Sequence, residues 1–401
     1  MDNKAWKPIK YERKIWETSY SDTQLYSQQI KWLAAHKEYD AAIPNFISKN
    51  EVELSKAEQK LINETFHLIG KFEVMMSQKS LTLPLILLRS ESSCSSQIEH
   101  LTTSAKKVAL AQLEAKSTTD AIMVVNNINA MTSALAQADM LSIKSILNIH
   151  KILLQNEKNM EPGKIRSKQV WIGGCNLWPS GALFVPPVCS RVEELLKDLI
   201  TFSKREDVDA ISKAAIIHAQ FETIHPFLDG NGRVGRTILH TILKHEGALT
   251  NSAIPISAGL LNNLDKYFKS LNDYRSGNYS SIINDFCIAI QNGILIADIM
   301  VKKIEETLMN WKNKIKARSD SNIWKAIYVL VEQPVINANF LAKKLNIHID
   351  NAYKIIDILI STGILKEISG GKRNTFYLAN EITNILDEVA SISSIRRIIQ
   401  K

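Results

Sequence analysis

Cysteine is scarce in this chain of 401 residues. The four cysteines show no C-x-x-C spacing, which argues against a zinc site and fits a reduced compartment better than a disulfide framework. Residues 1–20 mix Lys, Glu, Trp and Tyr without an apolar core, so we expect no signal peptide. No uncharged apolar run approaches the ~20 residues that span a bilayer, so we expect a cytoplasmic protein without a membrane segment.

Clustered positive charge is also missing. Lys and Arg total 49 against 41 Asp and Glu, a net charge of +8, but the basic residues are scattered. This balance permits contact with nucleotides or nucleic acid without requiring it. With 45% hydrophobic residues and helical periodicity along most of its length, the sequence predicts a mainly α-helical protein of two or three domains.

The most informative stretch runs from His225 to Arg236 and reads His-Pro-Phe-Leu-Asp-Gly-Asn-Gly-Arg-Val-Gly-Arg. Apolar residues at helical spacing before it predict a helix over residues 209–224, which Pro226 ends by moving His225 out of the α region. Apolar residues after it predict a second helix from near Arg233. The imidazole is therefore expected at the mouth of the loop between two helices.

This loop carries the groups that a phosphate site needs. Its two glycines let several backbone N–H groups converge at a helix N-terminus, where anions bind. Arg233 and Arg236 add permanently charged, forked donors, and Asp229 is a hard oxygen ligand for Mg²⁺. His225 is placed to accept a proton from an attacking hydroxyl. A Gly-Asn-Gly turn or a histidine before proline is common as a purely structural feature, but their combination here predicts a nucleotide-transfer site.

The stretch resembles the signature His-x-Phe-x-(Asp/Glu)-Gly-Asn-Gly-Arg-x-x-Arg of the Fic family and matches every specified position. The resemblance implies a protein adenylyltransferase that uses ATP and Mg²⁺ to move AMP to a Ser, Thr or Tyr hydroxyl of a target protein. It implies that His225 is the catalytic base and that Asp229 holds the metal against the α- and β-phosphates. Arg233 and Arg236 would bind the β- and γ-phosphates, and Phe227 would anchor the loop.

The resemblance also implies a set of nucleotide contacts. The Asn231 amide and nearby backbone N–H groups would stabilise charge on the α-phosphoryl oxygens. Tyr267, on a helix near residues 262–275, would border the adenine, although packing in the core is the alternative for this side chain. The full set is Gly230, Asn231, Gly232, Arg233, Val234, Gly235, Arg236 and Tyr267.

The stretch from Ser95 to His100 has two interpretations. From the residues alone, Ser96 and Glu99 have the spacing of a capping box that would begin a helix. The family resemblance adds an inhibitory (Ser/Thr)-x-x-x-Glu-(Gly/Asn) helix, which Ser95 and Glu99 match and from which His100 departs. In that role Glu99 would pair with Arg236 and keep the γ-phosphate out. We favour inhibition.

Two β-rich runs, Gln169–Gly173 and Ala182–Pro186, surround a Gly, Asn and Pro turn and predict a hairpin. A simple connector is the alternative from sequence alone. In the Fic family the corresponding hairpin is a flap beside the active site. The resemblance therefore implies that a protein substrate docks along residues 169–186 by β-augmentation.

The remaining chain is expected to be mostly helical. Residues 1–50 are predicted irregular, and Pro84 is expected to limit 81–88 to a short buried segment. Capping-box patterns at Ser55–Glu58 and Ser190–Glu193 predict helix starts. Further helices are expected at 104–118, 120–137, 140–155, 279–295 and 297–316. His150, on the third of these, is expected to be a packed core residue.

The C-terminal part has a different pattern. Helices at 322–332, 337–345 and 350–362, then strands at 364–369 and 374–379 around a Gly370–Arg373 turn, predict a winged helix-turn-helix. The expected domains are 1–103, with the inhibitory motif, 104–318, with the catalytic site, and 319–401. Asp350 and Asp357 on the candidate recognition helix favour a structural, dimerising or regulatory role over DNA reading. Removal of AMP assisted by Glu99, a DNA-binding regulator, self-modification and a homodimer are left open.

Overall fold

The computed structural model describes residues 6–17, 28, 37–79, 82–115, 117–137, 140–250, 253–368 and 375–400, and these residues are mostly helical, as predicted. The chain forms two compact units that interleave along the sequence. We call residues 1–59, 138–243 and 265–285 the motif unit, since it contains His225–Arg236, and residues 60–137, 244–264 and 286–401 the second unit. The consecutive domain boundaries at 103 and 318 stay a prediction.

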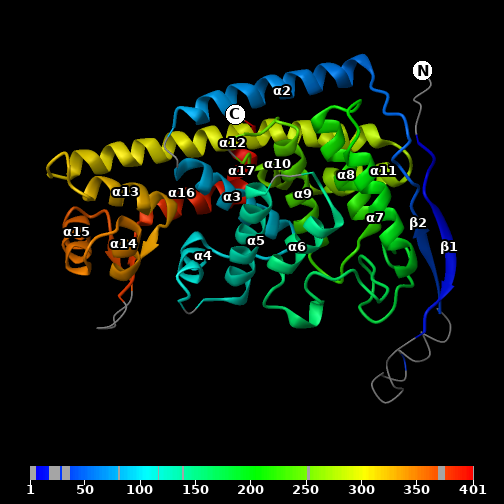
Figure 1. Cartoon of the computed structure of the whole chain (residues 1–401), viewed down its shortest axis with the longest axis horizontal. Coiled ribbons are helices and arrows are strands. Elements are labelled where there is room, and N and C mark those ends of the chain that lie inside the picture. The colour runs from blue at the N-terminus through cyan, green and yellow to red at the C-terminus, as the bar shows by residue number, and fades with distance from the viewer. Residues whose placement is uncertain are drawn as a thin grey trace. The chain divides into compact units, whose positions relative to one another are not determined.

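Two strands lie near the start of the motif unit, where the sequence predicts an irregular segment. β1 (Lys10–Ile15) and β2 (Glu38–Ile43) lie side by side (Figure 1). They pair antiparallel, with Lys10 opposite Ile43. No residue of β1 is fully buried, and β2 buries only the small side chains of Ala41 and Ala42. Because neither strand has an alternating apolar face, periodicity does not reveal them, and the prediction was wrong.

The α-helices of the motif unit begin within a few residues of the predicted starts. They are α6 (Ile143–Leu153), α7 (Cys189–Ser203), α8 (Ala210–Ile224), α9 (Asn231–His245, ending just past the unit boundary) and α11 (Leu264–Arg275), with a short 3-10 turn η2 (Lys158–Met160). α8 is buried along its whole length. Its N-terminus is capped by Asp209, whose carboxylate accepts the N–H groups of Ile211 and Ser212 at 3.0 Å each. A central, fully enclosed helix therefore leads into the motif.

The predicted capping boxes have opposite outcomes. At the start of α2 (Lys56–Ser77), the Ser55 N–H donates to Glu58 Oε2 at 2.6 Å and the Glu58 N–H to Ser55 Oγ at 3.2 Å, so that box is confirmed. At α7 the N-cap residue is Val188, which makes no side-chain cap bond. Ser190 already lies in the first turn of α7, so the box predicted there was wrong.

In the second unit, α3 (Thr82–Ile98) replaces the short segment predicted around Pro84. Proline is tolerated in the first turn of a helix, where its missing N–H would have no helical partner. Pro84 therefore begins this helix rather than breaking it. α3 packs against α5 (Thr119–Ala136), α10 (Ile256–Leu261) and α13 (Ile323–Glu332), and α4 (Ala105–Gln112) packs against α5.

One helix, α12 (Tyr279–Lys314), stands where the sequence predicts two. A glycine inside a helix costs about 1 kcal/mol relative to alanine. At Gly293 the missing side chain makes room for a neighbour, because a Cβ there would lie 2.9 Å from the Pro255 carbonyl oxygen. This packing offsets the cost of the glycine, so the helix continues across residue 296, where the sequence predicted a break. By length and composition α12 could cross a membrane, but 56% of its apolar window is buried, as in the core helix of a soluble domain.

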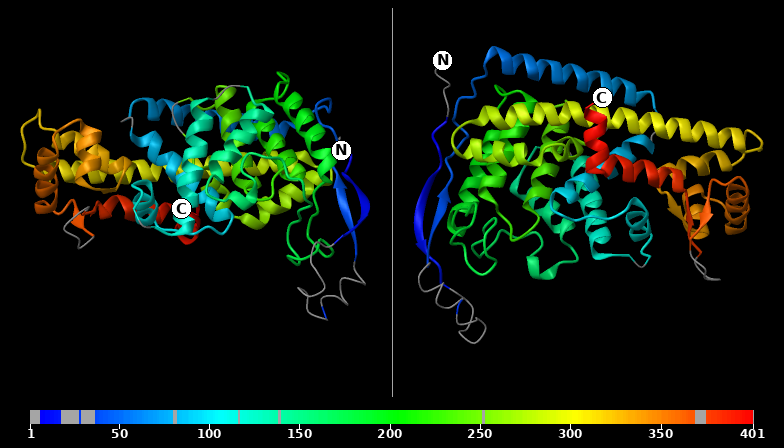
Figure 2. Two further views of the ribbon diagram at one scale, coloured as in Figure 1. Left: turned by 60° about the horizontal axis from the view of Figure 1, so that its bottom comes forward. Right: turned by 180° about the vertical axis from the view of Figure 1, so that it is seen from behind.

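The C-terminal elements follow the predicted order, with additions. After α13 come β3 (Val335–Ile336), α14 (Ala338–Leu345), α15 (Ile349–Ser361), β4 (Lys366–Glu367) and β5 (Tyr377–Leu378), and the sheet order is β3-β5-β4. β3 was not predicted, and the Gly370–Arg373 turn lies outside the described residues. Two further helices, α16 (Asn380–Ala390) and α17 (Ile392–Ile399), meet at a steep angle (Figure 2). The winged-helix assignment stays a prediction.

Candidate active site

His225 is the residue at which α8 ends. Its backbone is left-handed, with φ 51° and ψ 63°, and its N–H donates to the Phe221 carbonyl at 2.8 Å. A non-glycine residue held in this region costs about 1–3 kcal/mol, a strain that clusters at functional sites. The predicted helix end before Pro226 is therefore confirmed, and the side chain of His225 is 18% exposed.

Glu222 lies one turn before His225 and was not singled out from the sequence. Its carboxylate is 8% exposed, and its Oε2 lies 3.8 Å from His225 Nδ1. A buried carboxylate this close to an imidazole stabilises the positive charge that the ring would gain on accepting a proton. The i, i+3 spacing on α8 was the available signal, but a single glutamate on a helix is too common to stand out.

The loop after His225 is fastened by Phe227. Its side chain is fully buried, and its ring stacks on His150 with centroids 3.7 Å apart. The Phe227 N–H donates to Asn231 Oδ1, and Asn231 Nδ2 donates to the Phe227 carbonyl, both at 2.9 Å. The anchor role of Phe227 agrees with the sequence interpretation. The Asn231 amide thus holds this backbone from both of its ends, and its contact with the α-phosphoryl oxygens stays a prediction.

His150 was expected to be a packed core residue, and it is fully buried. Its Nδ1 accepts the Gly163 N–H at 3.0 Å, which leaves Nε2 to donate to the Asp229 carbonyl at 3.2 Å. Burial lowers the pKa of His150 to about 4, so the ring is neutral near pH 7. The sequence interpretation missed that this core residue also holds the motif loop.

The N-terminus of α9 carries two of the motif's charged side chains, Arg233 and Arg236. Gly230, just before it, has φ +80°, a conformation that glycine adopts without strain. Arg233 and Arg236 are each 2% exposed, and Arg233 Nη2 lies 3.2 Å from Asp229 Oδ2. The first N–H groups of a helix have no partner within the helix, and they give its N-terminus a partial positive charge. With two nearly buried arginines, the start of α9 is strongly positive.

Gly235 brings α9 close to α8. A Cβ at this position would lie 2.7 Å from Glu222 Oε1 and 3.0 Å from His218 Nδ1. The preceding residue, Val234, is fully buried. These two motif positions therefore serve the packing of α9, and any nucleotide contact they make is through the backbone.

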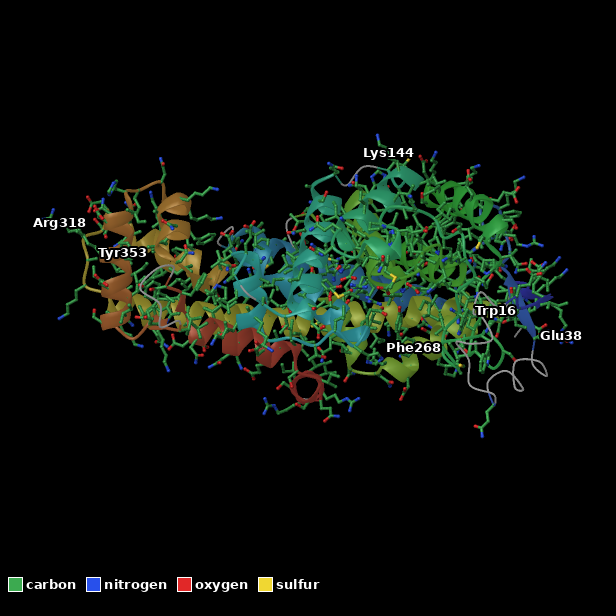
Figure 3. The ribbon with its side chains drawn as sticks, turned by 90° about the horizontal axis from the view of Figure 1, so that it is seen from below. Trp16, Glu38, Lys144, Phe268, Arg318 and Tyr353 are labelled. Carbon is green, nitrogen blue, oxygen red and sulfur yellow. The ribbon has the colours of Figure 1, made fainter. Side chains whose placement is uncertain are left out.

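Tyr267 of α11 is 2% exposed, and its hydroxyl lies 2.7 Å from His218 Nε2. The next residue, Phe268, is 47% exposed and lies at the surface (Figure 3). The contacts of Tyr267 are those of a packed core residue, the alternative that the sequence left open. Its contact with adenine stays a prediction.

The donor set at the motif fits a metal that arrives with a nucleotide. The Asp229 side chain is 45% exposed and so open to a ligand. Within the described ranges, no group of three or more His, Cys, Asp or Glu residues could hold a metal ion. Mg²⁺ is commonly bound by one or two carboxylates together with substrate phosphates, and Asp229 can supply the former.

Ser95 and Glu99 lie at the C-terminal end of α3, in the second unit. Ser95 is buried and Glu99 is exposed. The Leu101 N–H donates to the Ser96 carbonyl at 3.1 Å and the His100 N–H to the Gln97 carbonyl at 2.9 Å, the two bonds of a Schellman motif. The capping-box interpretation was therefore wrong, because the helix ends here. His100 occupies the left-handed position, with φ 62°, where glycine or asparagine is usual.

The predicted flap is less regular than expected. Ile172 and Phe184 form a single antiparallel bridge, with the Ile172 N–H donating to the Phe184 carbonyl at 2.9 Å. Gly173, Gly174 and Gly181 have φ of 73°, 75° and 79°, which turns the backbone away from the extended conformation and ends the ladder. The two predicted strands were therefore wrong beyond this one pair. The Ala42 N–H donates to the Val185 carbonyl at 3.0 Å and joins the flap to β2.

The structure is thus a mostly helical protein in which a short loop joins a left-handed histidine to a helix start with two nearly buried arginines. Residues 140–243 match the sequence model of the Fic/DOC family. The match contains the whole His225–Arg236 motif, so this segment of the chain is similar to the Fic/DOC family, as the motif predicted.

Named relatives agree with this assignment. Protein adenylyltransferase fic-1 of Caenorhabditis elegans is 37% identical over 112 residues, which cover 27% of this chain and 20% of the relative. A probable protein adenylyltransferase of Aquifex aeolicus is 30% identical over 203 residues, 48% of this chain and 56% of the relative. The chain therefore spans about a fifth to just over half the length of these relatives.

A crystal structure of a Fic family protein from Desulfovibrio desulfuricans has the same fold, with a TM-score of 0.54. The alignment covers 82% of this chain and 97% of that one, at 19% sequence identity. The similarity therefore extends well beyond the motif, although at this identity it concerns the fold alone.

Proposed function

We propose that this protein is a protein adenylyltransferase that moves AMP from ATP to a Ser, Thr or Tyr hydroxyl of a target protein. The observation that carries the proposal is the left-handed His225, which a short loop joins to the positive start of α9. In the transfer, the target oxygen attacks the α-phosphorus and its proton passes to His225. The bond from the α-phosphorus to the bridging oxygen breaks, and pyrophosphate leaves.

The triphosphate would lie over the first turn of α9. The backbone N–H groups of Asn231 to Arg233, in the first turn of α9, would bind the α-phosphoryl oxygens. Arg233 and Arg236 would bind the β- and γ-phosphates. Because both guanidinium groups are nearly buried, their attraction for phosphate is screened less by water than at a surface. Asp229 would hold Mg²⁺, which neutralises phosphate charge when it is bound.

His225 acts on the target hydroxyl. Its Nδ1 lies 3.8 Å from Glu222 Oε2, and Nε2 would accept the incoming proton. Glu222 would stabilise the imidazolium that forms, as the carboxylate does in a catalytic triad. The sequence predicted the base, and the position of the Glu222 carboxylate beside it supports that role.

The protein substrate would dock along the flap, residues 169–186. Beyond the Ile172–Phe184 pair, the described residues of the flap form no regular sheet with one another, so its backbone has edges for an added strand. A groove of about 320 Å³ lies between residues 179–185 and the β1–β2 strands, lined also by Tyr11 and Tyr39. Leu183, 85% exposed, offers an apolar contact beside it.

Labelled ATP tests the proposal. With Mg²⁺ and a cell extract as the source of acceptors, α-labelled ATP should leave label on protein and γ-labelled ATP should not. His225→Ala should lower the rate by about 10²–10⁴, with ATP affinity nearly unchanged, because the base acts on the target. His67→Ala, an exposed histidine on α2, is the matched control.

Each result bears on a separate part of the proposal. If label from γ-labelled ATP appears on protein, the proposed adenylyl transfer is wrong and the reaction is phosphoryl transfer. A His225→Ala rate within threefold of wild type would remove His225 as the base. Mass spectrometry of the chain itself after incubation with ATP and Mg²⁺ would detect self-modification by an added AMP.

A further inference from the structure

A buried arginine outside the motif contacts the peptide groups that follow the base. Arg166 is 2% exposed. Its Nε donates to the His225 carbonyl at 2.8 Å, and its backbone N–H donates to the Pro226 carbonyl at 2.9 Å. The last carbonyls of a helix have no helical partner, and here one residue satisfies the two that come directly after α8.

The far side of the same guanidinium contacts both ends of the flap. Nη2 donates to the Pro187 carbonyl at 2.5 Å, and Nη1 donates to the Lys168 carbonyl at 3.3 Å. Lys168 directly precedes residues 169–186, and Pro187 directly follows them. Nη1 also lies 3.2 Å from Cys189 Sγ. One planar group with five donors therefore joins the flap to the backbone of His225.

We propose that Arg166 is a positioning residue that fixes the His225 imidazole relative to the flap. The inference rests on the proposed function, in which the flap presents the hydroxyl whose proton His225 accepts. A misplacement of about 1 Å in such an alignment can cost about a hundredfold in rate. The side chain reaches neither the nucleotide groups of α9 nor Asp229 by any contact among the described residues, so ATP binding is expected to be independent of it.

A substitution series separates positioning from general stability. Arg166→Lys keeps the charge and most of the aliphatic side chain. An ammonium group, however, cannot donate to the His225 carbonyl and to the flap carbonyls at once, as the planar guanidinium does. Arg166→Met removes the donors. Arg191→Met is the control, because Arg191 is a 44% exposed arginine of the motif unit that pairs with Glu12. All variants are made in the full chain.

Three measurements are compared. The first is the rate of AMP incorporation from α-labelled ATP, and the second is the affinity for ATP with Mg²⁺. The third is the NMR signal of the His225 imidazole in ¹³C-histidine-labelled protein, assigned with His225→Ala. Both Arg166 variants should lower the incorporation rate by about ten- to a hundredfold, keep ATP affinity within about twofold, and shift or broaden the His225 signal. Arg191→Met should change none of these.

The outcomes are distinct. An Arg166→Lys variant with the wild-type rate and an unchanged His225 signal would overturn the inference, and so would an equal loss of ATP affinity. If Arg166→Met fails to fold, the lysine variant decides. If the wild-type chain transfers no AMP at all, the proposed function fails, while the His225 signal still shows whether Arg166 holds the base.

Discussion

The imidazole of His150 lies parallel to the ring of Phe227, with 8° between the two planes. Its two nitrogens bond to the Gly163 N–H and to the Asp229 carbonyl. One residue of α6 therefore holds the motif loop through a ring contact and a hydrogen bond. Because Nδ1 accepts a bond, this arrangement requires the neutral imidazole, and protonation of His150 should weaken it.

Stability should therefore fall in acid. The pKa of His150 is about 4 in the folded chain, against 6.5 ordinarily, because burial disfavours the charged ring. Between these values the unfolded chain binds a proton that the folded chain does not, so stability is lost as the pH falls from about 6.5 to about 4. His150→Phe keeps the ring contact but cannot titrate. Between pH 7 and pH 4.5, the free energy of unfolding in urea should fall by about 2 kcal/mol more in wild type than in this variant.

The control for this measurement is His67→Phe, since His67 is exposed on α2. It should lose as much stability over this range as wild type does. The same loss in His150→Phe as in wild type would mean that His150 does not titrate as its burial implies.

A methyl group at Gly235 should destabilise the packing of α9 on α8. A Cβ there would come within 2.7 Å of Glu222 Oε1, and overpacking in a core typically costs about 1–3 kcal/mol. We expect Gly235→Ala to lower the free energy of unfolding by that amount and to lower AMP transfer, because Glu222 also lies beside His225. Thermal and urea unfolding provide the first value.

Gly70→Ala is the matched substitution. Gly70 lies on α2, and a methyl group there would meet no heavy atom within 4 Å, so alanine should be neutral or stabilise by up to about 1 kcal/mol. Equal stability of the two alanine variants would show that α9 can move away from Glu222 without cost.

The sequence was most informative where a feature depends only on residues that are neighbours in the chain. Pro226 located the end of α8, and the motif located the site, because both signals depend on neighbouring residues. Glu222 was missed because a single glutamate one turn from a histidine is too common to stand out. Arg166 was missed because its contacts with His225 and Pro187 are tertiary, and spacing does not encode them. The same holds for β1 and β2, which lack apolar alternation, and for Pro84, whose effect depends on its place in the helix.

Removal of the Asp229 carboxylate should change the metal requirement. Asp229→Ala should raise the Mg²⁺ concentration needed for half-maximal transfer and lower turnover. The Asp229 carboxylate, which pairs with Arg233, is 45% exposed. Its removal should therefore lower the free energy of unfolding by at most about 1 kcal/mol. Asp229→Asn, which keeps the shape, should show the same metal effect. An unchanged Mg²⁺ titration in both variants would exclude Asp229 as the ligand.

Inhibition by Glu99 predicts a gain of activity on substitution. If Glu99 pairs with Arg236, it occupies the guanidinium expected on the γ-phosphate, and opening the pair costs about 1–3 kcal/mol. That suppresses transfer roughly ten- to a hundredfold. Glu99→Gly should therefore raise the initial rate of AMP incorporation. Glu99→Gln should do the same, since it removes the charge but keeps the size of the residue that ends α3.

The double substitution decides whether the gain acts through Arg236. Arg236→Ala should lower AMP transfer, and adding Glu99→Gly to it should give no further gain, because the group that Glu99 blocks is gone. Glu99 ends α3, so a mere effect on the helix would appear as a small change in thermal stability without a higher rate. Folded Glu99 variants that transfer AMP no faster than wild type would leave Glu99 as a helix-end residue. If Glu99→Gly raises the rate of AMP transfer equally in wild type and in Arg236→Ala, Glu99 inhibits through another residue.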